Sequence, residues 1–142
     1  MTLILDRTTP FQARVADQLQ RELIGWLTTV SPNSIPQPSP IWFIWNGADE
    51  VTIFSRPDAP RLRNIAQNPN VTFHFDSDAR GEHVAIFSGT ATIHTGPPSV
   101  TEFPGYVEKY HADLLIIGST PAEMDRDFTT RVVVKFDRLR GQ

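Results

Sequence analysis

Residues 37–55 read QPSPIWFIWNGADEVTIFS, and this stretch decides the fold. Nine of its 19 residues are aromatic or β-branched, which is typical of strands. The dipeptide Asn46-Gly47 near its middle predicts a hairpin turn, because both residues tolerate the positive φ angles of such turns. We therefore expect strands over Gln37–Asn46 and Val51–Ser55, paired antiparallel to one another.

The first of these strands is apolar on both faces. Side chains alternate along a strand, so its apolar residues divide into two sets. These sets are Ile41, Phe43 and Trp45 on one face, and Pro40, Trp42 and Ile44 on the other. One face can fill a barrel core, whereas the other needs a partner subunit, a flat aromatic ligand or a covering helix. Pro38 and Pro40 cannot donate to a strand ladder, which places the start of this strand at a sheet edge or a bulge.

Outward from this stretch, the patterning predicts four further strands and two or three helices. The strands are Ile24–Val30, Val71–Phe75, Val84–His94 and Thr129–Phe136. The segments with helix-start signals or helical patterning are 9–23, 58–67, 106–113 and 120–127, and two or three of them are expected to form helices. Antiparallel strands joined by tight turns and short helices favour a closed or half-closed barrel over a sandwich. We expect a mainly β, six-stranded antiparallel barrel that forms a single domain over residues 1–142.

Composition narrows the class of protein. Apolar residues make up 39% of the 142 residues and charged residues 20%, which suits one globular domain. The net charge of −3 argues against a nucleic-acid partner, because a phosphate backbone requires a basic face. The chain has no cysteine and no apolar run near the roughly 18 residues of a membrane helix. We expect a cytoplasmic protein that binds no membrane.

Residues 54–64, FSRPDAPRLRN, carry the clearest chemical signal. A strand ends at Ser55, a short loop follows, and a helix begins near Pro60. Free amides at a helix start carry partial positive charge, and arginine adds forked hydrogen bonds. The segment therefore predicts a phosphate site. An arginine-rich helix face in solvent would give the same pattern, and the residues alone leave both interpretations open.

Other reactive residues give no catalytic or metal site. The histidines lack metal-ligand spacing and are His74, His83, His94 and His111. Ser88-Gly89 is expected inside a strand, without the glycine pattern of a nucleophile elbow. Tyr106, Lys109 and Tyr110 are expected on a solvent-facing helix, with the mouth of a substrate site as the alternative.

Five short segments follow one another in a characteristic order: Ile24–Thr29, Gln37–Phe43, Ile53–Ser55, Arg61–Ile65 and Asn68–Val71. This order resembles the pyridoxamine 5′-phosphate oxidase-like split-barrel family, in particular its small members that use FMN or the deazaflavin F420. The resemblance covers about half the chain. It implies an FMN-binding type of split barrel, a homodimer, and two cofactors at the subunit interface.

The resemblance also implies which residues bind the cofactor. In such proteins the second strand lies along the isoalloxazine ring, which points here to Gln37, Pro40, Ile41 and Trp42. The end of a later strand and the following helix hold the phosphate. The corresponding positions are Phe54, Ser55 and Arg61, with Arg56, Arg63 and Asn64 as further candidates.

Two departures argue against oxidation of vitamin B6. The closing residues 137–142, DRLRGQ, lack the proline of the Arg-Leu-x-Pro motif of true oxidases. Ser39-Pro40 stands where those oxidases place an arginine that serves the substrate. The pattern is closer to F420-dependent reductases, which transfer a hydride between the cofactor and a small organic substrate. Hydride chemistry belongs to the cofactor and requires no side-chain acid or base.

The choice of cofactor and of function leaves alternatives. F420 carries an acidic tail beyond its phosphodiester, and the chain offers Arg56 and Arg63 beside Arg61, which favours F420 over FMN. A binding protein that carries a flavin without turnover would share the same site. A barrel that binds an acyl chain or haem is a third possibility, although a carrier of a neutral ligand has no need of the arginines.

Overall fold

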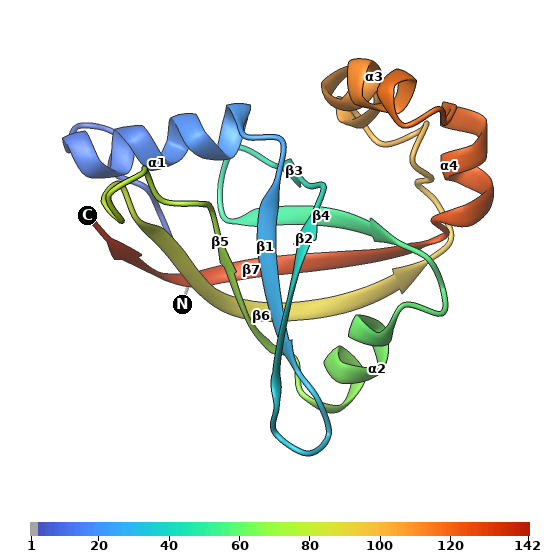
Figure 1. Ribbon diagram of the computed structural model, residues 1–142, viewed down its shortest axis with the longest axis horizontal. Coiled ribbons are helices and arrows are strands. Elements are labelled where there is room, and N and C mark those ends of the chain that lie inside the picture. Colours follow the sequence, from blue (N-terminus) through green and yellow to red (C-terminus); the bar gives the residue numbers. More distant parts are fainter. Residues whose placement is uncertain (1–2) are drawn as a thin grey trace.

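The computed structural model describes residues 3–142 and contains four helices and seven strands within them (Figure 1). The helices are α1 (Pro10–Arg21), α2 (Pro60–Gln67), α3 (Tyr106–Ile116) and α4 (Pro121–Asp127). The strands are β1 (Gly25–Val30), β2 (Pro36–Ile41), β3 (Ile44–Trp45), β4 (Glu50–Ser55), β5 (Asn70–His74), β6 (Ala85–Thr95) and β7 (Thr130–Gly141). No helix within the described residues has the length and apolar character needed to cross a membrane.

The strands form one curled antiparallel sheet in the order β2-β1-β5-β6-β7-β4-β3. This arrangement confirms the expected mainly β split barrel, with seven strands instead of six and four helices instead of two or three. The prediction of one continuous strand over Gln37–Asn46 is wrong. The chain leaves β2 after Ile41, passes through Trp42 and Phe43, and begins β3 at the opposite edge of the sheet.

β2 is an edge strand, as its prolines predict. Pro36, Pro38 and Pro40 lie opposite Val30, Thr28 and Trp26 of β1. Because proline has no N–H, these three occupy the positions that do not hydrogen-bond to β1. At such positions the backbone nitrogen and carbonyl point away from the partner strand. The free edge of β2 therefore presents carbonyl oxygens and no N–H at the three prolines.

The two predicted apolar faces around Phe43 enter two different cores. Ile41, Phe43 and Trp45 join the barrel core, whose centre includes Phe73 and Phe87. Trp42 and Ile44 pack against a second cluster between β4 and the helices α3 and α4. That cluster contains Phe54, Val100, Tyr106, Tyr110, Leu114 and Met124. Of the alternatives for the second face, a covering helix accounts for Trp42 and Ile44.

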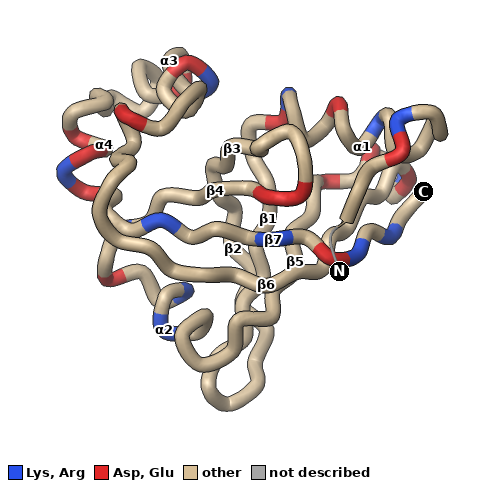
Figure 2. Tube along the Cα trace, turned by 180° about the vertical axis from the view of Figure 1, so that it is seen from behind, with Lys and Arg blue, Asp and Glu red and all other residues tan. Residues whose placement is uncertain are grey.

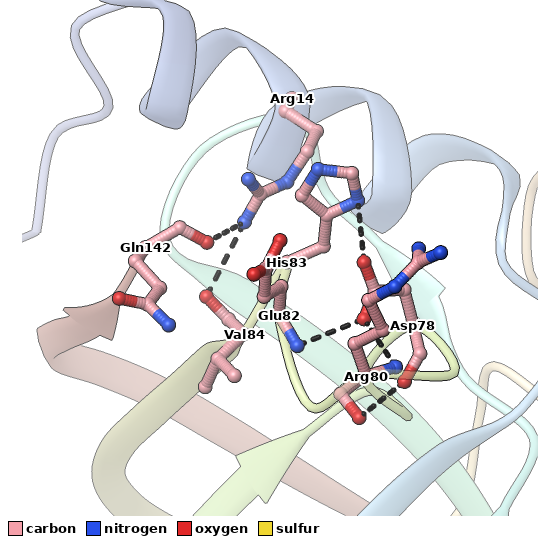
Figure 3. Close-up of polar contacts among 8 residues, drawn as sticks. Arg14, Asp78, Arg80, Glu82, His83, Val84 and Gln142 are labelled. Carbon is pink, nitrogen blue, oxygen red and sulfur yellow. Dashed lines mark hydrogen bonds and ion pairs between the residues drawn. The ribbon is translucent and has the colours of Figure 1, made fainter.

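Helix α1 lies across one end of the barrel, at a distance from α2 (Figure 1). Thr9 caps it by accepting a hydrogen bond from the Gln12 amide at 3.3 Å. Arg14 fastens the helix to the sheet by donating to the carbonyls of Val84 at 3.3 Å and Gln142 at 2.7 Å (Figure 3). These carbonyls lie beside the start of β6 and the end of β7.

The last strand is longer than predicted and extends to Gly141 instead of ending at Phe136. A β-bulge explains the difference: Gly89 lies opposite Phe136, while Ser88 lies opposite Arg138. The extra residue, Asp137, breaks the alternation, after which Leu139 again packs on the barrel core. Residues 137–141 are thus a continuation of the ladder and not a free tail.

Candidate functional site

A cavity of about 560 Å³ lies between the barrel wall and the α3–α4 segment. The barrel side consists of Ile24, Pro40, Ile41, Trp42, Ile53, Phe54, Arg56 and Arg61. The helical side consists of Tyr106, Ile117, Gly118, Ser119, Glu123, Met124, Asp127 and Phe128. Six of the residues predicted to bind the cofactor meet here: Pro40, Ile41, Trp42, Phe54, Arg56 and Arg61. The cavity combines apolar walls with a few charged groups, as ligand sites commonly do.

Ser55 and Arg61 meet where β4 ends and α2 begins. The Ser55 side chain is buried, and its Oγ accepts a hydrogen bond from Arg61 Nη1 at 3.1 Å. Both residues line a smaller hollow of about 410 Å³, which shares Arg56, Arg61 and Phe128 with the main cavity. The N-cap of α2 is Ala59, which has no side-chain oxygen to accept from the first amides of the helix.

Arg61 is a half-buried guanidinium without a counter-charge in the part of the chain that the structure describes. No carboxylate there lies within salt-bridge distance of it. Burial lowers the pKa of Arg61 from its ordinary value, because removal from water disfavours the charged form. The group nevertheless remains charged, since the ordinary pKa of arginine lies far above neutrality. A buried charge of this kind is stabilised when an anion binds beside it.

Arg56 has closer neighbours than Arg61. Its guanidinium carbon lies 4.8 Å from the ring centroid of Phe128, which is a cation–π contact. Asp127 also lines the cavity, and a hydrogen bond from Arg126 holds its pKa below the usual value, with the charge of Arg56 acting in the same direction. Arg56 is therefore partly compensated by groups of the chain.

Gln37, Arg63 and Asn64 do not join the main cavity. They line a separate groove of about 570 Å³ together with Pro60 and residues 31–33. Asn64 is buried, and its Nδ2 donates to Thr29 Oγ1 at 3.0 Å and to Gln37 Oε1 at 2.7 Å. Asn64 and Gln37 thus tie α2 to the β1–β2 pair. Because Pro60 also lines the hollow of Ser55 and Arg61, the three hollows follow one another around the start of α2.

The expectation that Tyr106, Lys109 and Tyr110 lie on a solvent-facing helix surface is wrong. Tyr106 and Tyr110 are buried, and the Tyr110 ring stacks on Trp42 with centroids 4.4 Å apart. Lys109 is half-buried, and burial lowers its pKa to about 8. The spacing of Tyr106, Tyr110 and Leu114 is a helical stripe and could have indicated this buried face.

The helical side of the cavity is the part that sequence reasoning missed. A capping pattern at Thr120 to Glu123 predicts α4, and the structure confirms that Thr120 Oγ1 accepts from the Glu123 amide at 3.1 Å. Nothing local places this helix against β4. Met124 and Phe128, four residues apart, form the apolar stripe that could have suggested such a contact.

The charged side chains divide between the two sides of the cavity. Figure 2 shows basic segments on α2 and both acidic and basic segments on α4. Arg61 lies on α2, whereas Glu123 and Asp127 line the cavity from α4. None of the four histidines lines this cavity. Within residues 3–142, no three His, Asp or Glu side chains gather in a way that could hold a metal ion.

Comparison with protein families gives one match. The family described as pyridoxamine 5′-phosphate oxidase matches residues 11–142, which covers both the barrel and the α3–α4 segment. No curated protein matches the chain.

Solved structures share this fold at low sequence identity. A structure named as an F420 reductase is 24% identical, with a TM-score of 0.68 over 89% of this chain and 95% of that one. A conserved hypothetical protein from Mycobacterium tuberculosis is 22% identical, with a TM-score of 0.68 over 90% of this chain and 81% of that one. The haem storage protein HutZ from Vibrio cholerae is 13% identical, with a TM-score of 0.64 over 94% of this chain and 95% of that one.

Proposed function

Because the chain belongs to the pyridoxamine 5′-phosphate oxidase family, we propose that its cavity binds F420, with FMN as the alternative, and that the protein is an oxidoreductase. The bound ring would supply the chemistry, a hydride transfer to or from a small organic substrate. The residues of the chain would hold the phosphate, orient the ring and exclude water.

The half-buried guanidinium of Arg61 is the observation that carries this proposal. It points to an anion from outside the chain, because no described carboxylate pairs with it. Ser55 Oγ lies beside it and could share that anion. The start of α2 adds few free amides, because Pro60 has no N–H and the Leu62 amide donates to the Ala59 carbonyl, which leaves the amides of Arg61 and Arg63. A phosphate fits this combination of a guanidinium, a hydroxyl and backbone amides at a helix start.

The ring would lie along the barrel wall at Pro40, Ile41 and Trp42, which line the cavity next to the arginines. The substrate would approach from the side of α4. Glu123 on that side disfavours an anionic substrate, because like charges repel at short range, whereas the charge of Asp127 is paired with Arg126. We therefore expect a neutral or cationic substrate of largely apolar character.

F420 is favoured by the hollows around α2. Its acidic tail extends beyond the phosphodiester, and the hollows lead from Arg61 past Pro60 to Arg63. Arg63 is exposed and lines the last of them. FMN ends at its phosphate and would make no use of that groove. The fold shared with an F420 reductase agrees with this choice.

Calorimetric titration with F420 and FMN tests the choice of cofactor. We expect F420 to bind at least tenfold more tightly than FMN. Replacing both Arg56 and Arg63 by alanine should weaken F420 about fivefold, because exposed ion pairs contribute about 0.2–1 kcal/mol each. Arg63→Ala alone should leave FMN affinity nearly unchanged, because Arg63 lies in the separate groove, whereas Arg56 lines the hollow of Ser55 and Arg61. If FMN binds at least tenfold more tightly and the double variant leaves F420 unaltered, FMN takes the place of F420.

One further measurement distinguishes an enzyme that uses the cofactor from a protein that only carries it. A reductase with bound reduced cofactor should lose the reduced absorption spectrum when a suitable acceptor is added, whereas a carrier should keep it. Haem storage, the role named for HutZ, would give an intense Soret band in the purified protein. Histidine is a common axial ligand of haem, and the absence of a cavity histidine does not favour that alternative.

We also propose a homodimer, although Trp42 and Ile44 no longer supply the reason for it. Leu115, Ile116 and Ile117 are 69%, 81% and 61% exposed, and Leu23 and Ile24 are exposed nearby. Ile24 and Ile117 also line the cavity, so this apolar surface is continuous with its rim. Contiguous exposed apolar surface commonly marks an interface.

Light scattering at micromolar concentration should give twice the 16.0 kDa mass of one chain. Ile116→Glu should shift the protein towards monomer by placing a charge in the interface. Ile4→Glu is the matched control, because Ile4 is 82% exposed and lies outside this surface. A monomer mass for the unmodified protein would contradict the dimer and any cofactor site shared between subunits.

A further inference from the structure

The backbone of Phe43 lies at the break between β2 and β3, outside both strands. A buried amide and carbonyl require hydrogen-bond partners, and here no strand supplies them. The Phe43 N–H donates to Tyr110 Oη at 2.8 Å. The Phe43 carbonyl accepts from Lys109 Nζ at 2.8 Å. The residues that close the barrel at this point therefore belong to α3.

Tyr110 Oη makes a further contact that connects three parts of the chain. It lies 2.7 Å from the Leu23 carbonyl, to which it can donate, and 3.0 Å from the Phe43 carbonyl. Leu23 immediately precedes the pocket residue Ile24 and the start of β1. One hydroxyl thus joins α3 to the chain before β1 and to the break after β2.

The ring of Tyr110 acts on the adjacent side chain. It stacks on the Trp42 indole with centroids 4.4 Å apart and planes within 2° of parallel. Trp42 lines the cavity beside Pro40 and Ile41, whereas Tyr110 itself does not line it. The hydroxyl and the ring together fix both the backbone at the break and the indole plane beside it.

We propose that Tyr110 is a positioning residue that holds the Trp42 wall of the cavity in the orientation a cofactor ring requires. The inference rests on the proposed function in one respect, namely that this wall faces a flavin or deazaflavin. Tyr110 would act through Trp42 and Phe43, without contacting the ligand itself. A helix that merely covered the apolar face would need the ring of Tyr110 and not its hydroxyl.

Tyr110→Phe tests the positioning directly, because it keeps the ring and removes only the hydroxyl. The change leaves the buried Phe43 N–H without its partner, so the break should rearrange. We expect the dissociation constants for F420 and FMN, measured by calorimetry on folded protein, to rise about tenfold. Phe87→Leu is the control, because Phe87 is buried in the barrel core and lines none of the cavities described above. It should lower stability while leaving both constants unchanged.

A second readout needs no cofactor. With Trp26 and Trp45 replaced by phenylalanine, Trp42 is the only indole left among the three tryptophans of the chain. In that background Tyr110→Phe should increase acrylamide quenching of Trp42 at least twofold. If Tyr110→Phe does not fold, Lys109→Met removes the other bond to Phe43 and should raise quenching in the same direction.

The outcomes separate this inference from the proposed function. If the unmodified protein binds neither F420 nor FMN, the proposed function is wrong, and the quenching experiment still decides whether α3 orients Trp42. If the unmodified protein binds a cofactor and Tyr110→Phe binds it equally well, the positioning role is wrong. Unchanged Trp42 quenching in Tyr110→Phe, or in Lys109→Met where only that variant folds, overturns the inference as well.

Discussion

Arg61→Ala should raise the dissociation constants of F420 and FMN, the two proposed cofactors, tenfold to a hundredfold. A charge-assisted hydrogen bond contributes about 1.5–3 kcal/mol, which corresponds to that range of affinity. Folding should survive, because no buried carboxylate would lose its partner when Arg61 is removed. Ser55 Oγ would lose one donor, which is a small cost beside the lost phosphate contact.

Calorimetric titration of the variant checks this expectation. Arg63→Ala is the matched control, because Arg63 lies on the same helix but is exposed in the separate groove. It should leave FMN affinity within about twofold of the unmodified protein. No substitution on α1 should match the effect of Arg61→Ala, since α1 contributes nothing to the cavity lining. Unchanged affinity in Arg61→Ala would move the phosphate to another part of the surface.

Gly89→Ala should destabilise the barrel by about 3 kcal/mol, which is the largest effect on stability that we expect. A Cβ at this position would lie 2.1 Å from the Lys135 carbonyl oxygen and 3.2 Å from the Phe136 Cα. Both are backbone atoms of β7, so the clash cannot be relieved by turning a side chain. β6 and β7 would have to separate at the bulge that bends them.

Thermal unfolding measures this effect, and we expect the midpoint to fall by about 10 °C. Ser88→Ala serves as the control, because Ser88 is the preceding residue of β6 and is only half-buried. It should change the midpoint by no more than about 2 °C. The protein that remains folded should bind cofactor with unaltered affinity, because Gly89 does not line the cavity. A midpoint for Gly89→Ala within about 2 °C of that of the unmodified protein would contradict the close approach of the β7 backbone to Gly89.

The features that the sequence predicts well depend on residues near one another in the chain. Local geometry accounts for the hairpin that joins β3 and β4, for the edge position of Pro38 and Pro40, and for the two faces around Phe43. Of the two expected turn residues, only Gly47 has a positive φ. The break at Phe43 does not, because its partner Tyr110 lies 67 residues away. An alternating apolar pattern continues through the break and gives no sign of it.

The candidate site likewise has one part that local sequence predicts and another that depends on contacts between distant parts of the chain. Phe54, Arg56 and Arg61 lie within a few residues of the strand-to-helix turn, and they do meet at one cavity. Asn64 follows them closely, yet its side chain faces Thr29 and Gln37, because the helix turns it towards the other side of α2. The helical wall comes from 106–128, and only tertiary packing brings it to β4.

The three prolines of β2 should also lower the tendency of the protein to aggregate at high concentration. An exposed sheet edge can recruit a strand from another molecule, and such strand addition is a common route to aggregation. A recruited strand needs both donors and acceptors from the edge, and Pro36, Pro38 and Pro40 supply no N–H. The opposite edge, β3, is only two residues long. Within residues 3–142 no further strand covers either edge of the sheet, and neither edge offers a second molecule a full set of backbone donors and acceptors.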